Sequence, residues 1–196
     1  MRVILASASP RRKELLKKII KDFEIIPSDV DESKIKDNSV DQLVEKLSYA
    51  KAENVFIKEQ EKSDDLIVIG VDTMVALENK FLGKPKDVED AKKMLSDLSG
   101  KSNYVYTGLS IIVKQKNKIT KEVVNSKTRV VMKKMSNNDI EEYVSTGEPL
   151  DKAGAYAVQG KGAKYIEEVD GNYNSVVGLN IELLKEFLEK YGVEVL

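Results

Sequence analysis

The segment Ser7-Ala8-Ser9-Pro10-Arg11-Arg12 combines residue types suited to binding an anion. It follows a short apolar run and precedes a helical pattern, so Ser9 is expected to cap a helix that starts at Pro10. The unpaired N–H groups and positive dipole of such a terminus attract phosphate, and two adjacent arginines add bidentate donors. The alternative is an ordinary capped helix with solvated arginines. Against this alternative, Arg2 and Arg129 are the only other arginines in a chain rich in lysine.

Asp72-Thr73 lies inside the most apolar stretch of the chain, Leu66 to Leu77. A carboxylate within a buried strand is unfavourable unless it is hydrogen-bonded, paired with a cation or bound to a metal. The alternative is a pair of residues that ends the strand or forms a bend. Because a buried Asp is rare and the chain has no His, Asp72 is the leading candidate for a general base or a metal ligand.

Other positions carry weaker signals when each is considered alone. Three acidic residues after a predicted strand form either a metal-binding cluster or a solvated loop: Asp29, Asp31 and Glu32. Lys84 has a glycine and a proline on either side, but it is also one lysine among many. Lys51 lies within a predicted helix and is unremarkable by itself. The segment Gly160-Lys161-Gly162 lacks the spacing of a phosphate-binding P-loop, which excludes that interpretation.

The amino-acid composition restricts the available chemistry, because the chain contains no His, no Cys and no Trp. Ser-His-Asp and Cys-His catalysis, Cys/His zinc sites, iron–sulfur clusters and disulfides are therefore excluded. Acid–base chemistry must use carboxylates, Lys, Tyr or metal-bound water. Any metal ion is expected to be a hard cation with oxygen ligands, such as Mg²⁺ or Mn²⁺.

Length and charge narrow the class of protein further. A chain of 196 residues suggests one domain, with room for two lobes. Because 32 Lys and Arg balance 33 Asp and Glu to give a net charge of −1, no nucleic-acid partner is expected. No apolar run reaches the roughly 18 residues of a membrane span, so no membrane partner is expected either. The first residues do not resemble a signal peptide, and the expected location is the cytoplasm.

The pattern of apolar and turn-forming residues predicts strands and helices that alternate in the first half of the chain. Strands are expected at Val3 to Ala6 and Phe23 to Ile26, and the apolar segment Leu66 to Leu77 is expected to form a strand pair with Asp72 in its middle. A helix with a capping box at Ser39 and Gln42 is expected before a charged loop at 58–65. The predicted inner face of this helix carries Leu43, Leu47, Ala50 and Val55.

The second half of the chain is predicted to be richer in strands. Tyr104 to Val113 and Ile119 to Met132 are expected to form a hairpin through 114–118. Helices are expected after Asp87, after Ser136 and from about Ile181 to Tyr191. Five of the 11 glycines fall within 154–178 and imply several tight backbone positions. The predicted fold class is α/β with a mixed sheet, not a strict βαβ repeat.

Several segments match one family pattern in order: LASASPRRKELL, GVDTMVAL, LGKPKDVEDAKKMLSDLSG with VYTG, GEPLDKAGAYAVQGKGA and NYNSVVGL. Together they resemble the Maf family of nucleotide pyrophosphatases over nearly the whole chain. The resemblance implies a mixed, elongated β-sheet flanked by helices, similar to the inosine triphosphate pyrophosphatase-like (Maf/Ham) fold. It also implies a single domain over residues 1–196 and a homodimer.

The activity implied by this resemblance is hydrolysis of a nucleoside triphosphate between its α and β phosphates. By position, Asp72 is the implied proton acceptor. The implied phosphate and metal site is lined by Ser7, Arg11, Arg12, Glu32, Lys51 and Lys84. The stretch at 153–160 is similar to the branch of the family that acts on dTTP and UTP. In that branch the positions that set base preference correspond to Arg11, Thr73 and Gln159, and a Gln amide offers a pyrimidine both a donor and an acceptor.

Two positions depart from the family pattern. Asn103 stands where the family commonly has His. The positioning role that such a His could have is therefore in doubt, but Asp72 remains the expected base. Asn180 stands where the family commonly has Pro, and it is expected to change only how the last helix begins.

The hypothesis for the reaction is that Mg²⁺ or Mn²⁺ bridges the triphosphate and carboxylates including Asp72 and Glu32. Asp72 would deprotonate the attacking water. Charge on the pyrophosphate leaving group would be neutralised by Arg11, Arg12, Lys51 and Lys84. The competing hypothesis is a non-catalytic nucleotide-sensing regulator of septum formation and cell division, since the family is also associated with those processes.

Overall fold

The computed structural model describes residues 1–196, and the chain divides into two compact units. The first unit comprises Met1–Asp72, Thr107–Ser126 and Gly178–Leu196. The second unit comprises Thr73–Tyr106 and Lys127–Val177.

The first unit contains most of the parallel part of the sheet and the longest helix. Its complete elements are β1 (Arg2–Leu5), α1 (Pro10–Leu16), β2 (Glu24–Ile25), the short 3-10 helices η1 (Glu32–Lys34) and η2 (Gln60–Lys62), α2 (Val40–Glu59) and α6 (Ile181–Lys190). Three strands contribute residues to both units: β3 (Asp65–Leu77), β5 (Ser102–Gln115) and β6 (Lys118–Met132).

The sheet mixes parallel and antiparallel pairs, with the strand order β2-β1-β3-β5-β6-β7 and β4 paired with β3. β1 is parallel to both of its neighbours, so that Leu5 lies opposite Ile25 of β2 and Ile69 of β3. β5 and β6 are neighbours joined by two residues, a connection that only an antiparallel hairpin permits. The mixed α/β sheet and the hairpin predicted from the sequence are therefore confirmed.

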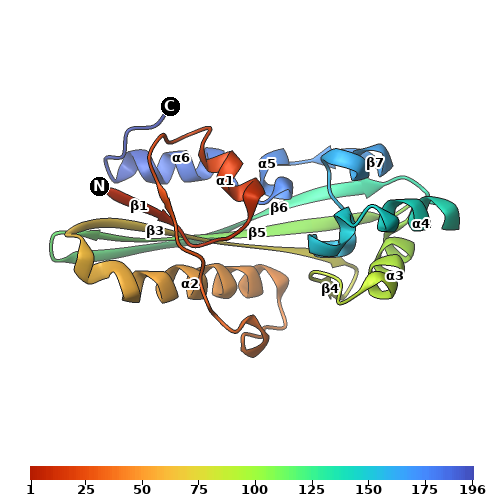
Figure 1. Ribbon diagram of the computed structural model, residues 1–196, viewed down its shortest axis with the longest axis horizontal. Coiled ribbons are helices and arrows are strands. Elements are labelled where there is room, and N and C mark those ends of the chain that lie inside the picture. The colour runs from red at the N-terminus through yellow and green to blue at the C-terminus, as the bar shows by residue number, and fades with distance from the viewer. The chain divides into compact units, whose positions relative to one another are not determined.

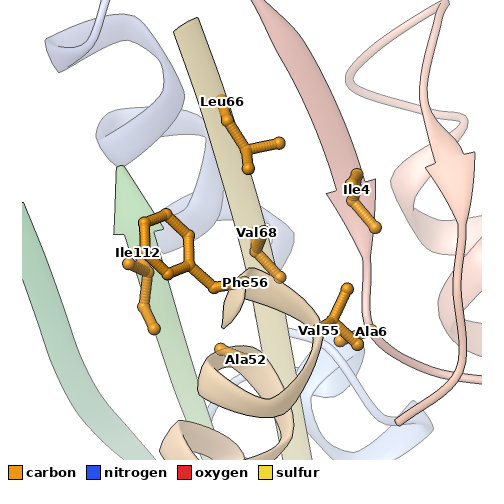
Figure 2. Close-up of a cluster of buried hydrophobic side chains, with 8 residues drawn as sticks. All are labelled: Ile4, Ala6, Ala52, Val55, Phe56, Leu66, Val68 and Ile112. Carbon is orange, nitrogen blue, oxygen red and sulfur yellow. The ribbon is translucent and has the colours of Figure 1, made fainter. Parts of the chain in front are cut away.

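In the first unit, helices cover both faces of these strands, with α2 on one face and α1 and α6 on the other (Figure 1). Apolar residues recur along α2 at helical spacing and pack on alternate residues of β3. Figure 2 shows the resulting cluster, in which side chains from β1, α2, β3 and β5 meet. Its buried members are Ile4, Ala6, Ala52, Val55, Phe56, Leu66, Val68 and Ile112.

Two glycines allow the backbone of α2 to lie directly against the sheet. A Cβ atom on Gly70 would be 2.0 Å from the carbonyl oxygen of Ser48, and one on Gly108 would be 2.2 Å from that of Val44. Real side chains do not tolerate such distances. A buried hydrogen bond of 2.7 Å between the hydroxyls of Ser48 and Ser110 adds a polar contact at the same interface. The position of α2 on β3 and β5 is thus fixed one turn before Lys51.

The second unit contains its own helices and a segment of short turns. Its complete elements are β4 (Lys80–Leu82), α3 (Val88–Leu98), α4 (Asn137–Ser145), η3 (Glu148–Asp151), η4 (Ala153–Ala155), η5 (Gly160–Tyr165), β7 (Ile166–Asp170) and α5 (Tyr173–Val177). β7 pairs with β6 in antiparallel register. Four of the five glycines in 154–178 have positive φ, as the predicted tight backbone requires: Gly154, Gly160, Gly171 and Gly178.

The predicted helix caps are mostly confirmed. Asp87 accepts a hydrogen bond from the N–H of Asp90, and Ser136 forms a full capping box with Asp139. Asn180 caps α6 by accepting from the N–H of Leu183 at 3.0 Å. The expectation that Asn180 alters the start of the last helix is consistent with this bond.

Three details of α2 were predicted wrongly. The helix starts after Ser39, but there is no capping box because the Ser39 hydroxyl donates to Asp41 instead. Ala52, not Ala50, is fully buried on the inner face. The helix also continues to Glu59, where a charged loop from residue 58 was expected, because Arg2 and Lys62 pair with the Glu59 carboxylate. No helix in the structure has the length and apolarity needed to cross a membrane.

Candidate functional site

The candidate site of the first unit forms where β1 ends beside β3. Leu5 and Ile69 are the last paired residues of these parallel strands. Ser7 follows two residues after Leu5, and Asp72 follows three residues after Ile69. Parallel strands end at the same edge of a sheet, and the space beyond that edge is a common ligand site in α/β proteins. The strand register therefore brings two of the predicted site residues to one edge.

The first turn of α1 has the predicted cap and holds an arginine. The Ser9 hydroxyl accepts from the N–H of Arg12, and Pro10 is the first helical residue. The Arg12 guanidinium donates to the Ser7 hydroxyl at 3.2 Å and to the carbonyl oxygen of Gly178 at 3.0 Å. Arg12 is thus held in a fixed orientation by the segment after β1 on one side and by the segment before α6 on the other.

The central feature of the site is a lysine between two carboxylates. Lys51 Nζ lies 2.6 Å from Asp72 Oδ1 and 3.0 Å from Glu32 Oε1. The side chains of Lys51 and Asp72 are 10% and 8% exposed, whereas that of Glu32 is 54% exposed. The cluster therefore has a buried end at Asp72 and an open end at Glu32.

The electrostatic environment favours a basic carboxylate at the buried end. Burial raises the pKa of Asp72, and the nearby charges of Lys51 and Arg12 oppose that rise without cancelling it. Burial also lowers the pKa of Arg12, and the charge of Arg11 lowers it further. Asp72 Oδ2 is buried and has no hydrogen-bond partner. A buried carboxylate oxygen without a partner is unfavourable, so this atom is available to a ligand.

The site offers carboxylate oxygens, which are the type of donor that a hard divalent cation prefers. Asp72 Oδ2 is a buried oxygen without a partner, and Glu32 supplies a second carboxylate through the shared contact with Lys51. Oxygen donors are the ligands that Mg²⁺ prefers, and Mg²⁺ commonly takes only one or two carboxylates beside substrate phosphates. Asp29 and Asp31 do not join them, because Asp29 pairs with Lys58 and Asp31 caps η1. No group of three or more acidic side chains is placed to hold a metal ion.

The structure thus places five predicted residues in the first unit: Ser7 contacts Arg12, Lys51 contacts Asp72 and Glu32, and Arg12 is close enough to Asp72 for its charge to lower the pKa of that carboxylate. Arg11 follows Pro10 in α1 and is half-buried. The remaining predicted residues belong to the second unit: Thr73 is half-buried in β3, while Lys84 and Gln159 are exposed. The functional roles assigned to all of these residues stay predictions.

Asn103, one of the two departures from the family pattern, is fully buried in the second unit. Its amide oxygen accepts from the Tyr156 hydroxyl at 2.7 Å, and its amide nitrogen donates to the carbonyl oxygen of Val130 at 3.3 Å. Asn103 therefore anchors the segment that leads to Gln159.

One contributor to the site escaped sequence reasoning, and another was named only through the family resemblance. The carbonyl oxygen of Gly178 orients Arg12 across 166 positions of the sequence, and no local pattern signals such a contact. Lys51 did carry a signal, because Leu43, Leu47 and Val55 continue the same four-residue spacing through it. A lysine in the apolar stripe of a helix faces the core, and a buried lysine requires a charged partner.

The fold and the site together define a mixed α/β protein with a buried carboxylate, lysine and arginine cluster at the end of parallel strands. The family model described as "Maf-like protein" matches residues 2–191. The chain therefore belongs to the Maf family. A protein of Clostridium botulinum (strain Okra / Type B1) named dTTP/UTP pyrophosphatase is 49% identical over 193 residues, which cover 97% of each chain. One of the same name from Clostridium novyi (strain NT) is 47% identical over 194 residues, 98% of this chain and 99% of that one.

Among solved structures, the Staphylococcus aureus Ham1 protein matches with a TM-score of 0.46 and 16% identity, covering 97% of this chain and 99% of that one. A Mycobacterium abscessus nucleoside-triphosphatase (dITP/XTP pyrophosphatase) matches with a TM-score of 0.41 and 11% identity, covering 97% and 95%.

Proposed function

We propose that this protein hydrolyses dTTP and UTP to the nucleoside monophosphate and pyrophosphate. The observation that carries the proposal is the buried Asp72, whose pKa is raised and whose neighbours are the cations Lys51 and Arg12. A site that only bound nucleotide would gain nothing from a basic carboxylate beside its cations. Relatives at 47–49% identity that share almost the full length are named dTTP/UTP pyrophosphatases, which supports the choice of substrate.

In the proposed reaction Asp72 orients a water molecule and accepts its proton as the water attacks the α phosphate. The raised pKa makes the carboxylate a stronger base than an exposed Asp, provided that it remains ionised. Arg12 is already oriented by Ser7 and Gly178, so it offers positive charge to the phosphates without first losing side-chain freedom. Preorganised charges of this kind stabilise the leaving group in the transition state.

A divalent cation, Mg²⁺ or Mn²⁺, would be held by Asp72 and Glu32 together with phosphate oxygens, and it would supply charge neutralisation to the triphosphate. Arg11 and Lys84 are proposed to add charge at the phosphates. Thr73 and Gln159 are proposed to contact the base. A homodimer and a cytoplasmic location complete the proposal; sedimentation of the purified protein and fractionation of the source cells test them.

Pyrophosphate release from a panel of nucleotides tests the proposed activity. Release is expected to be fastest with dTTP and UTP and to require Mg²⁺ or Mn²⁺. Binding of dTTP without any release would instead favour the competing nucleotide-sensing function.

The Asp72→Asn variant tests the assigned base. It is expected to lose about 10²- to 10⁴-fold in kcat at saturating metal, the range that a positioned base contributes. Asp65→Asn is the matched control, because Asp65 is exposed and lies at the start of the same strand. Its side chain accepts a hydrogen bond from the backbone N–H of Lys116. Near wild-type activity of Asp72→Asn would show that Asp72 is not the base.

A further inference from the structure

The ammonium group of Lys51 occupies the space between the two carboxylates of the site. Its Nζ atom lies within hydrogen-bond distance of Asp72 Oδ1 and of Glu32 Oε1, at 2.6 and 3.0 Å. Mg²⁺ binds oxygen at about 2.0–2.1 Å and Mn²⁺ prefers the same hard ligands. A divalent ion that took Asp72 Oδ1 and Glu32 Oε1 would have to lie where the ammonium is, and an ion bound through the unpartnered Asp72 Oδ2 would lie within a few ångströms of the same positive charge.

Lys51 cannot yield this space by a shift of its helix. α2 is in close contact with β3 at Ser48, three residues before Lys51. A Cβ atom added to Gly70 of β3 would lie only 2.0 Å from the Ser48 carbonyl oxygen. Only the flexible side chain of Lys51 can move. When it moves away from Asp72 and Glu32, its charge needs a new partner, because a buried lysine is strongly destabilised without one.

A nucleoside triphosphate offers such a partner. We propose that Lys51 excludes the divalent cation from the two carboxylates before a nucleotide binds and releases them only when the phosphates of the nucleotide accept its charge. This inference rests on the proposed nucleotide-hydrolysing function and adds a binding order to it. Because coupling between two ligands is reciprocal, the cation and the nucleotide each strengthen binding of the other through the same side chain.

This arrangement has a chemical consequence. With Lys51 between the two carboxylates, the 2.6 Å bond holds Asp72 Oδ1 in place before the nucleotide binds. Lys51 is in this sense a positioning residue as well as a proposed phosphate ligand.

Binding of Mn²⁺ alone, measured by electron paramagnetic resonance without nucleotide, tests the inference. The Lys51→Met variant is expected to bind Mn²⁺ at least about tenfold more tightly than the wild type, because two like charges a few ångströms apart repel strongly in a buried site. Lys46→Met is the matched control: Lys46 lies on the same helix, is exposed and pairs with Asp37. Its Mn²⁺ affinity is expected to equal that of the wild type.

A second variant shows where the ion binds. In Lys51→Met/Asp72→Asn the gain is expected to disappear, and a gain that persists there would overturn the inference. Equal or weaker Mn²⁺ binding by Lys51→Met would also overturn it. Circular dichroism establishes that each variant is folded, and Lys51→Gln replaces Lys51→Met if the latter is not.

A measurement on the wild type makes the test independent of variant folding. The ¹⁵N signal of Lys51 Nζ is assigned by its absence in Lys51→Arg. It is expected to stay unchanged when Mg²⁺ alone is added at concentrations that do not saturate the wild-type site. It is expected to shift when Mg²⁺ and the non-hydrolysable analogue α,β-methylene-dTTP are added together. A signal that does not respond to the two together would overturn the inference. Pyrophosphate release by the wild type is a separate readout, so the proposed function and the proposed binding order can fail independently.

Discussion

Replacement of Gly70 by alanine tests whether the close approach of α2 to β3 positions Lys51 on Asp72. The added Cβ would lie 2.0 Å from the Ser48 carbonyl oxygen and 2.7 Å from the Ala52 nitrogen. Both are backbone atoms, so neither can rotate away. Ordinary contacts begin near 3.4 Å, and the helix and strand would have to separate by about 1.4 Å.

The expected loss of stability follows from this clash. Overpacking of a well-packed core costs about 1–3 kcal/mol, and each kcal/mol lowers Tm by about 2–4 °C in a protein of this size. Gly70→Ala is therefore expected to lower Tm by about 2–12 °C in thermal denaturation. Gly83→Ala is the control for stability, because its Cβ would meet only the Met74 sulfur at 3.8 Å. The Tm of this control is expected to remain close to that of the wild type.

The same shift is expected to reduce activity. A displacement of about 1.4 Å would lengthen the 2.6 Å bond between Lys51 and Asp72 beyond hydrogen-bond distance. The same shift would misplace Lys51 and Asp72 relative to a bound nucleotide, and a misplacement of about 1 Å can reduce kcat by about 10²-fold. Pyrophosphate release is measured at a temperature where the variant is fully folded. Unchanged Tm and unchanged kcat together would refute the role of the close approach.

Two further predictions concern contacts away from the site. In Tyr156→Phe, the buried amide oxygen of Asn103 loses its 2.7 Å donor, so unfolding should require about 1–3 kcal/mol less; an unaltered denaturant midpoint would contradict this. Arg2 pairs with Glu24 and lowers the pKa of that carboxylate, and the pKa of Glu59 is lowered first by Lys62 and then by Arg2. Such lowered carboxyl pKa values stabilise the fold above the unfolded pKa of about 4.3, and this stabilisation is lost as the pH falls through the folded pKa. The Tm difference between wild type and Arg2→Gln should therefore be large at pH 7 and small near pH 3, and a constant difference would argue against the ion pairs as its source.

The sequence by itself determined the features that depend on neighbouring residues. The cap at Ser9 and Pro10, the cap at Asp87 and the hairpin between β5 and β6 follow from local backbone chemistry, and each is present. Family motifs spread along the whole chain indicated the Maf family, and the matched family model confirms it. The candidate site could be named in part from local signals, because an Asp in an apolar strand must have a special environment.

Only the tertiary structure decided how those residues meet. Lys51 and Asp72 are 21 positions apart, and Arg12 and Gly178 are 166 apart. Such contacts depend on strand order and on how closely a helix approaches a sheet, which Gly70 permits through the absence of a side chain. The sequence therefore supplied the charged groups, whereas the packing of α2 against β3 decided that a lysine, and not solvent, lies against the carboxylate of Asp72.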